Sequence, residues 1–332
     1  MLRVPFDEMK GLFRRILVSR GLEEGEAETL ACIVATNSLE GVYSHGTNRF
    51  PRLVHDIECG TVDKDAKVEK VIQAGSMECW NGHFGIGPLN AWKAMERATE
   101  LAHEHGMGLV ALGWNNHWLR GSTYGRLAAE RGCIGICWSN TKPNMPVWGG
   151  TVPKIGNNPL IISVPKADGA HFVFDSAMSQ YSYGKLEEYR LKGEMLPFAG
   201  GFDDEGRLTS DPAVIEHNGR MLPIGLWKGS GLSIALDLIA TVLSGGASVT
   251  QIGQMGNERG LTQIMIAIEA DRLGGGKDVD RIVSTILGDL KSGEAVRYPG
   301  ERLERTRKEN LEAGIPVDER IWAQIEELGA GC

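Results

Sequence analysis

Apolar side chains recur every three or four residues at the start of the chain. One such face contains Met9, Leu12, Phe13, Ile16 and Leu17, and a second contains Ala27, Leu30, Ala31 and Val34. This spacing is typical of amphipathic helices that bury one side. Two helices are therefore predicted at the start of the chain, and the second should end near Gly41.

Later runs that are rich in apolar and β-branched residues predict strands. These runs are GLVALGW at 108–114, CIGICWS at 133–139, PLIISVP at 159–165 and TQIMIAIEADRL at 262–273. Helical patterns at 87–106 and 122–132 separate them, and this alternation predicts an α/β core. Asp168 and Gly169 suit a tight turn between two β-rich runs, so we expect one hairpin and a mixed sheet.

Further helices are predicted towards the C-terminal end. A strongly apolar pattern follows Gly229, Ser230 and Gly231, and other helical patterns cover 279–290 and 317–328. A length of 332 residues suggests about two domains. We expect a helical region at 1–75, joined by the C-terminal segment 300–332, and an α/β core at 76–299.

Composition and charge narrow the class of function. With 42% hydrophobic and 23% charged residues the chain is expected to fold, and a formal net charge of −8 argues against a general affinity for nucleic acid. The N-terminus lacks the apolar core of a signal peptide, and no stretch approaches the ~18 apolar residues of a membrane span. We expect a cytoplasmic protein without membrane contact, whose partners are small molecules.

The cysteines do not match a metal site, and the glycines do not match the dinucleotide-binding fingerprint of a Rossmann domain. The six cysteines form no CxxC pair, so we expect reduced thiols. Cys133 and Cys137 lie in a predicted strand and are interpreted as buried small side chains, so no metal site is predicted. Gly82, Gly85 and Gly87 have the wrong order for the GxGxxG fingerprint of a Rossmann domain. A nucleotide site in this chain would be of another kind.

The segment SHGTNRFP concentrates side chains that can do acid–base chemistry. Ser44 or Thr47 can cap a helix that has Pro51 in its first turn. His45 and Arg49 would then lie at, or just before, the same helix end. A histidine transfers protons near neutrality and an arginine binds a carboxylate through two hydrogen bonds, so the pair suits a 2-oxo or 2-hydroxy acid. The alternative is a helix cap beside a surface arginine.

Two other segments have both a functional and a structural interpretation. His117 lies in the loop WNNHWLRG after a predicted strand, where it could belong to a site or make a structural hydrogen bond. In WKGSG, glycines at a helix start would let backbone N–H groups approach a phosphate, with Lys228 adding charge. The alternative for WKGSG is a tight turn before a buried helix.

Six segments follow one another in an order known from one family: GVYSHGTNRFPR, NNHWLRGSTYG, IGNNPLIISVP, SYGKLE, GGFDDEG and WKGSG. On these motifs the chain resembles the malate/L-lactate dehydrogenase family of non-Rossmann oxidoreductases, and the similarity extends from the first helix to VDERIWAQIEEL. The resemblance implies an NAD(P)-dependent enzyme, with NADH preferred and NADPH possible, that forms a homodimer. It also implies an L-sulfolactate dehydrogenase-like fold, with a mainly helical N-terminal region beside a mixed-sheet α/β core.

The resemblance also implies roles for individual residues. His45 would be the proton donor, Arg49 would hold the substrate carboxylate, Ser44 would orient the imidazole or a substrate hydroxyl, and His117 would face the carbonyl. The implied cofactor-binding residues are His171, Phe172, Val173, Phe174, Asp175, Ser176, Ala177, Trp227, Lys228, Gly300, Glu301 and Arg302. A helix N-terminus should lower the pKa of His45, whereas reduction needs its protonated form. We therefore expect a nearby acid, which the sequence does not identify.

The segment CWSNTKPNMPVWGG departs from the related sequences, which are small and apolar there. It introduces Thr141, Lys142 and Asn144, which would lie near the substrate, and Lys142 is predicted to bind it. The substrate within the class is therefore open between a diketo sugar acid and malate, lactate or ureidoglycolate. Two alternatives from other classes are a metal-dependent hydrolase that uses His45, His117 and a carboxylate, and a non-catalytic scaffold.

Overall fold

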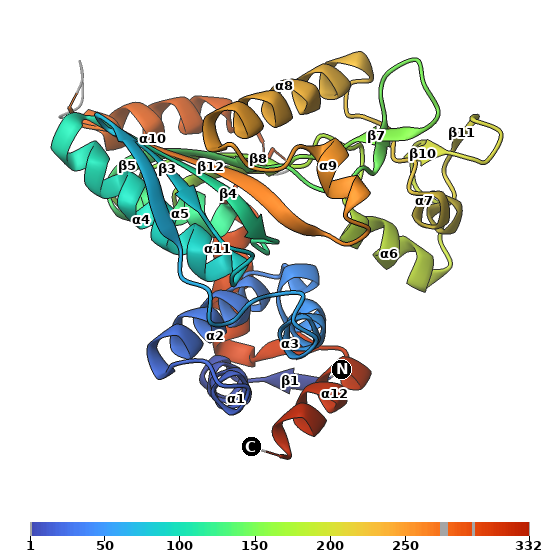
Figure 1. Ribbon diagram of the computed structural model, residues 1–332, viewed down its shortest axis with the longest axis horizontal. Helices are drawn as coiled ribbons and strands as arrows, with labels where there is room; N and C mark the ends of the chain where they lie inside the picture. Colours follow the sequence, from blue (N-terminus) through green and yellow to red (C-terminus); the bar gives the residue numbers. More distant parts are fainter. Residues whose placement is uncertain (1, 273–277, 294–295, 332) are drawn as a thin grey trace.

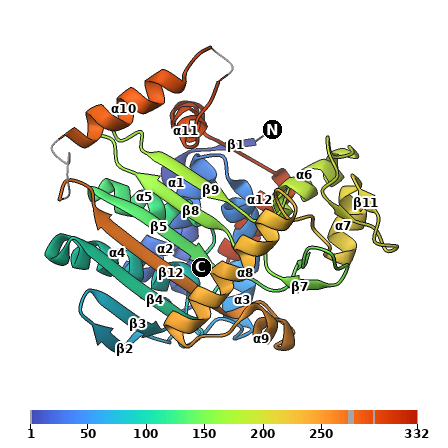
Figure 2. The same cartoon turned by 90° about the horizontal axis from the view of Figure 1, so that it is seen from above.

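A seven-stranded mixed sheet forms the centre of the computed structural model, which describes residues 2–272, 278–293 and 296–331 (Figures 1 and 2). In spatial order its strands are β2 (Glu69–Ala74), β3 (Met77–Asn81), β4 (Met107–Asn116), β12 (Arg259–Glu269), β5 (Cys133–Ser139), β8 (Leu160–Val164) and β9 (Phe172–Ser176). β3 and β4 run parallel, and the other neighbouring strands of this sheet are antiparallel. The predicted strands and the mixed sheet are confirmed; the last residue of the predicted run 262–273 lies outside the described residues.

Helices cover both faces of this sheet. The helices α4 (Gly87–His105) and α5 (Ser122–Glu130) pack on one face, and α8 (Trp227–Ser244) crosses the other, with α10 (Val279–Leu290) on the same side as α8 (Figure 1). β12 is almost continuously buried, because a strand covered on both faces needs apolar side chains on both. The hairpin predicted at Asp168–Gly169 joins β8 to β9, and Gly169 has the positive φ of 76° that such a turn favours.

A second group of elements packs below the sheet in Figure 1 and brings the two chain ends together. It contains α1 (Phe6–Ser19), α2 (Glu24–Leu39), α3 (Phe50–Glu58) and α12 (Glu319–Gly329), and β1 (Leu2–Val4) pairs with β13 (Ile315–Val317). The two predicted N-terminal helices are confirmed, and their apolar faces share one core with Trp322 and Ile325. α11 (Glu301–Ala313) lies between this group and the sheet. The domain division at residue 75 stays a prediction, and β2 places residues 69–74 in the sheet.

Shorter elements form a lobe at one end of the molecule (Figure 1). They are β6 (Met145–Pro146), β7 (Pro153–Ile155), α6 (Tyr183–Lys192), β10 (Gly201–Phe202), β11 (Leu208–Thr209) and α7 (Pro212–Asn218), with α9 (Val249–Gln254) beside them. Two 3-10 turns, η1 (Tyr43–His45) and η2 (Thr47–Arg49), join α2 to α3. No helix among the described residues combines the length and apolar character needed to cross a membrane.

The pairing of the strands gathers several loops at one edge of the sheet. Asn116 at the end of β4 pairs with Arg259 at the start of β12, and Ser139 at the end of β5 pairs with Gln263. The end of β9 reaches the same edge, because it pairs with the start of β8. The loops that contain His117, Lys142 and Glu258 therefore begin or end here.

Candidate active site

Ser44, His45 and Arg49 lie in η1 and η2 rather than in a regular helix. α3 begins only at Phe50, with Pro51 in its first turn, and it has no side-chain cap. The prediction that Ser44 or Thr47 caps a helix is therefore wrong. The placement of His45 and Arg49 just before a helix is confirmed.

The loop that carries His45 is tied to the end of α2. The Asn37 side-chain amide donates to the carbonyl of His45 over 2.9 Å, and the Thr47 N–H donates to the Ser38 hydroxyl over 2.8 Å. A Cβ atom on Gly46 would overlap the Ser38 hydroxyl, so only glycine allows this close approach. Fully buried polar side chains thus fix the backbone of the histidine.

The rings of His45 and His117 stack, with their centroids 5.9 Å apart and their planes 14° apart. The Ser44 hydroxyl lies 3.1 Å from Nδ1 of His45, as expected for a residue that orients the imidazole. Nδ1 of His117 accepts the N–H of Leu119 over 3.1 Å, so the neutral His117 ring carries its proton on Nε2. The structure therefore brings together the two histidines that the sequence singled out.

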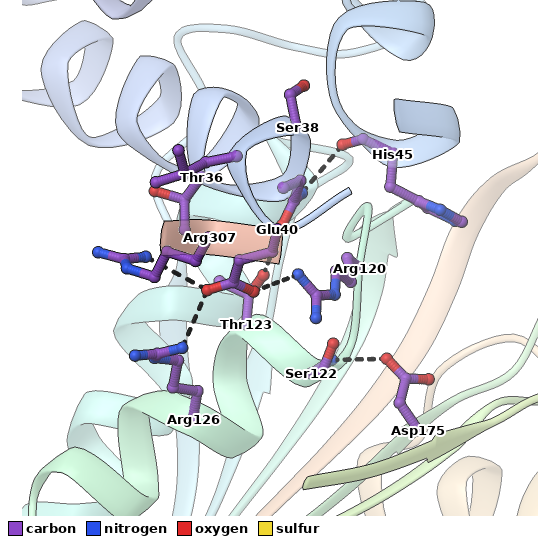
Figure 3. A network of polar contacts seen from close by, with 12 residues as sticks. Thr36, Ser38, Glu40, His45, Arg120, Ser122, Thr123, Arg126, Asp175 and Arg307 are labelled. Carbon is purple, nitrogen blue, oxygen red and sulfur yellow. Dashed lines mark hydrogen bonds and ion pairs between the residues drawn. The ribbon is translucent and has the colours of Figure 1, made fainter. Parts of the chain in front are cut away.

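Three charges act on the protonation of His45. Burial lowers its pKa to about 4, Asp175 opposes this shift, and Arg49 and Arg120 add to it. Asp175 is a nearby acid of the kind that could compensate for the lowered pKa, and the sequence did not identify it in this position. Its carboxylate accepts the N–H of Ser122 at the start of α5 over 3.0 Å, which fixes its position (Figure 3).

The pKa of His117 is lowered as well. Burial, Arg49 and the neighbouring His45 lower the pKa of His117 well below its ordinary value. Its Nε2–H can donate a hydrogen bond to an oxygen atom, but an imidazolium at this position is strongly disfavoured. Because Nδ1 of His117 already accepts the Leu119 N–H, this ring is arranged to donate a hydrogen bond through Nε2.

Arg49 and His117 line one cavity of about 100 Å³ beside α3. The Arg49 guanidinium lies 3.8 Å from the carboxylate of Glu258, which also lines the cavity. Sequence reasoning missed Glu258, because only the antiparallel pairing of β12 with β4 places it beside His117. A small acid that enters here would meet an arginine and a histidine N–H.

Two of the segments predicted to bind the cofactor are in contact. A Cβ atom on Gly300 would come within 2.9 Å of the carbonyl of His171 and 3.0 Å of the nitrogen of Val173, and Gly300 has a positive φ of 96°. Glu301 follows at the start of α11, and its Oε2 atom is buried without a hydrogen-bond partner. Arg302 is exposed. The segments 171–177 and 300–302 thus form one surface.

The third predicted segment, Trp227–Lys228, is the start of α8, so the predicted helix begins before the glycines rather than after them. The residues that lead into α8 are held next to the end of β9, because the N–H of Ile224 donates to the carbonyl of Met178 over 2.8 Å. The N–H of Gly229 already donates to the carbonyl of Ile224 over 2.8 Å. The tight-turn interpretation of WKGSG accounts for these bonds, which leaves the exposed Trp227 and Lys228 side chains as candidate ligands.

The loop after β5 contains the predicted substrate residue Lys142. Thr141 and Asn144 are buried and hydrogen-bonded to the carboxamide of Asn157, at 3.1 and 2.8 Å, so these two residues hold the loop in shape. Lys142 between them is exposed at the same edge of the sheet as His117. Its role in substrate binding stays a prediction.

Solved structures with the same fold are dehydrogenases. The sulfolactate dehydrogenase of Methanocaldococcus jannaschii superposes with a TM-score of 0.90 at 27% identity, covering 99% of this chain and 97% of that one. The malate dehydrogenase of Entamoeba histolytica gives a TM-score of 0.94 at 24% identity, covering 99% and 98%. The predicted fold, a mixed-sheet α/β core without a Rossmann domain, is confirmed.

Sequence comparison gives the same family. The chain is 46% identical over 334 residues to the 2,3-diketo-L-gulonate reductase of Escherichia coli strain K12, which covers 98% of this chain and 100% of that protein. The family model described as malate/L-lactate dehydrogenase matches residues 4–326. The oxidoreductase interpretation is thereby confirmed over the hydrolase and the scaffold. The chain belongs to the malate/L-lactate dehydrogenase family.

Proposed function

We propose that this protein uses NADH to reduce a 2-oxo sugar acid, with 2,3-diketo-L-gulonate as the first candidate substrate. The observation that carries the proposal is the stacked pair of His45 and His117, with Arg49 and His117 on one cavity, in a chain 46% identical along its whole length to a reductase of that acid. The pair offers a proton donor and a hydrogen-bond donor, and Arg49 offers a partner for a carboxylate.

We expect the surface formed by residues 171–177 and 300–302 to hold part of a dinucleotide. Gly300 packs directly on the backbone of His171 and Val173, where a Cβ atom would not fit, and so holds the two segments together; the unpartnered Oε2 of Glu301 can accept a hydrogen bond from a ribose hydroxyl. Trp227 and Lys228 at the start of α8 would hold the remaining part of the cofactor. When bound, the dihydronicotinamide supplies the hydride.

The protein's own groups handle the charge that develops on the substrate. His45 donates a proton to the carbonyl oxygen as negative charge forms there, which contributes about 10² to 10⁴ in rate. The Nε2–H of His117 donates a hydrogen bond to the same oxygen, and Arg49 binds the carboxylate. Ser44 holds the imidazole of His45 through Nδ1.

Substrate binding also favours the protonation of His45. Arg49 lowers the pKa of His45, and a bound carboxylate would neutralise that guanidinium. The pKa of His45 should therefore rise when the oxo acid binds, which favours the protonated form at the moment when it is needed.

The preference for NADH rests on the residues at the start of α11. The Glu301 carboxylate is paired with Lys291 through Oε1, and its Oε2 has no hydrogen-bond partner, so this position would suit a ribose 2′-hydroxyl better than a 2′-phosphate. Arg302 is exposed next to it and would have to turn towards a 2′-phosphate for NADPH to bind well. The carboxylate argues for NADH.

The proposal includes the formation of a homodimer, and the exposed apolar side of α8 supports this part. The outer side of this helix exposes Leu232, Ile239 and Val242 at helical spacing, and Val242 is 78% exposed. Exposed apolar stripes of this kind typically mark interfaces. Light scattering coupled to size exclusion should give the mass of two chains.

A panel of substrates tests the proposed function, with NADH and NADPH for the reductions and NAD⁺ and NADP⁺ for the oxidations. It should contain 2,3-diketo-L-gulonate, oxaloacetate and pyruvate for reduction, and malate, lactate and ureidoglycolate for oxidation. We expect the highest kcat/KM with 2,3-diketo-L-gulonate and NADH. Higher values with oxaloacetate or pyruvate would assign the chain to the malate or lactate branch, and no turnover with any acid would overturn the proposal.

A further inference from the structure

A buried carboxylate lies behind the two histidines, at the end of α2. Glu40 is 5% exposed and binds three arginines: Arg120 at 2.5 Å, Arg126 at 3.0 Å and Arg307 at 3.3 Å (Figure 3). None of these residues lines the cavity of Arg49 and His117, but Glu40, Arg120 and Arg126 line another cavity together with His171, Val173 and Gly300 of the proposed cofactor surface. The proposed proton transfer and carboxylate binding do not use the cluster.

The three arginines come from three different parts of the fold. Arg120 follows His117 in the loop before α5 and is itself 6% exposed. Arg126 lies in α5, and Arg307 lies in α11, which begins after the Gly300 turn. Glu40 directly precedes the loop with Ser44 and His45. One carboxylate therefore joins both histidine loops and the helix next to the proposed cofactor surface.

A second contact ties the same end of α2 to α5. The Thr123 hydroxyl donates to the side-chain oxygen of Asn37 over 3.1 Å, and the amide of Asn37 donates to the carbonyl of His45 over 2.9 Å. Thr123 follows Ser122, whose N–H binds Asp175. The position of His45 relative to His117 and Asp175 thus depends on how α2 and α5 are joined.

We infer that Glu40 is a positioning residue for the proposed reduction: by binding Arg120 it holds the His117 loop against the His45 loop and balances the arginine charge that faces His45. The inference rests on the proposed function. Glu40 does not touch the substrate in this account and acts through Arg120.

An effect on the charge around His45 distinguishes this role from simple stabilisation. The charged groups that face His45 are Asp175 from β9, Arg49 from η2 and Arg120 from the loop before α5, and the His117 ring is stacked on it. Asp175 raises the pKa of His45, and both arginines lower it. Without the Glu40 carboxylate, the Arg120 charge would act on His45 without a counter-charge, so the pKa of His45 should fall further.

Two charge-removing variants should therefore move the pH profile in opposite directions. Reduction needs protonated His45, so kcat/KM falls at the high-pH side of its profile. In Glu40→Gln this falling limb should move to lower pH by about 0.3 to 1 unit, and in Arg120→Gln it should move to higher pH by a similar amount. Glu40→Asp keeps the charge and should retain the parent's limb.

The chain offers a matched control at the other side of the sheet. Glu78 in β3 is 2% exposed and binds Arg97 at 3.0 Å, so Glu78→Gln also breaks a buried carboxylate–arginine pair. It should lower the thermal midpoint, but by less than Glu40→Gln, because Arg97 is 29% exposed and keeps its pair with Glu100, whereas Arg120 is buried. It should leave the pH profile unchanged.

An NMR titration of the His45 imidazole provides a readout that does not depend on turnover. If Glu40→Gln lowers the His45 midpoint and Arg120→Gln raises it, the inference holds even if every tested substrate fails. If both variants keep the parent's midpoint, or both move it in the same direction, Glu40 is only a structural ion-pair partner and the inference is wrong. If Glu40→Gln does not fold, the same titration of the other two variants tests the inference. Arg120→Gln should raise the His45 midpoint and Glu40→Asp should leave it unchanged, and any other result would contradict the inference.

Discussion

His45 and His117 stack with their ring centroids 5.9 Å apart, although one lies in the loop after α2 and the other in the loop after β4. The two rings have different hydrogen bonds at Nδ1. His117 accepts a backbone N–H there and is fixed as the Nε2–H tautomer, whereas His45 faces the Ser44 hydroxyl, which can either donate or accept. Of the two rings, only His45 can gain and lose a proton while keeping its hydrogen-bond partner at Nδ1.

Arg49→Lys should raise KM for carboxylate substrates. The lysine keeps the positive charge but lacks the planar fork that binds both carboxylate oxygens, so we expect a rise of about 10- to 100-fold, with a smaller change in kcat. Arg52→Lys is the matched control, because its side chain lines the same cavity but is 56% exposed. Equal KM values for the two variants would contradict the role of Arg49.

The two directions of the reaction should depend on pH in opposite ways. The pKa of His45 is lowered to about 4 in the protein without substrate, so raising the pH above this value removes the proton that reduction needs. We expect kcat/KM for reduction to fall with rising pH, by up to about tenfold per unit, while oxidation, which needs neutral His45 as the base, does not fall. Initial rates measured in both directions across the same buffers check this, and a reduction rate that rises with pH would contradict it.

Lys228→Ala should weaken NADH binding without unfolding the protein. The side chain is exposed and belongs to the predicted cofactor residues, so its loss should raise the dissociation constant about two- to fivefold, as for an exposed charge pair. Fluorescence titration with NADH measures this constant. Lys185→Ala on α6 is the control, because that exposed lysine lies over the ring of Tyr189, as Lys228 lies over the ring of Trp227. An unchanged constant in Lys228→Ala would remove Lys228 from the cofactor site.

Lys142→Ala should change which acid is preferred rather than how well NADH binds. Thr141 and Asn144 are pinned by hydrogen bonds on either side, so replacing the exposed side chain between them should leave the loop in place. The ratio of kcat/KM for 2,3-diketo-L-gulonate and oxaloacetate should then differ from that of the parent. If both the ratio and the NADH affinity stay the same, Lys142 is a solvated loop residue.

Periodicity and composition could predict most of the fold, because each element carries its own pattern. The helical faces of α1 and α2, the apolar run of β12 and the turn at Gly169 are local signals. The helix cap at Ser44 or Thr47 was predicted from the same kind of signal and is wrong, because the backbone there folds back onto Ser38 instead. Contacts with α2 decided this local structure, and they are not visible in SHGTNRFP alone.

The candidate site could be predicted only in part, because its charges come from distant segments. His45, His117 and Arg49 stand out by residue type, and two of the cofactor segments meet at Gly300 as one surface. Asp175 is predicted to bind the cofactor, but its effect on the pKa of His45 follows from the end of β9 lying beside the start of α5. Glu258 reaches Arg49 through strand pairing, which no local pattern encodes.

The most direct test of the account is the turnover of His45→Ala and His117→Ala, measured together with NADH binding. His45→Ala removes the proposed proton donor but none of the proposed cofactor contacts, so kcat should fall by about two to four orders of magnitude while NADH still binds as in the parent. His117→Ala should retain more activity, because it removes a hydrogen-bond donor and not the acid. If His45→Ala turns over at close to the parent's rate, while His117→Ala is inactive and still binds NADH, the proton donor is His117 and the central claim is wrong.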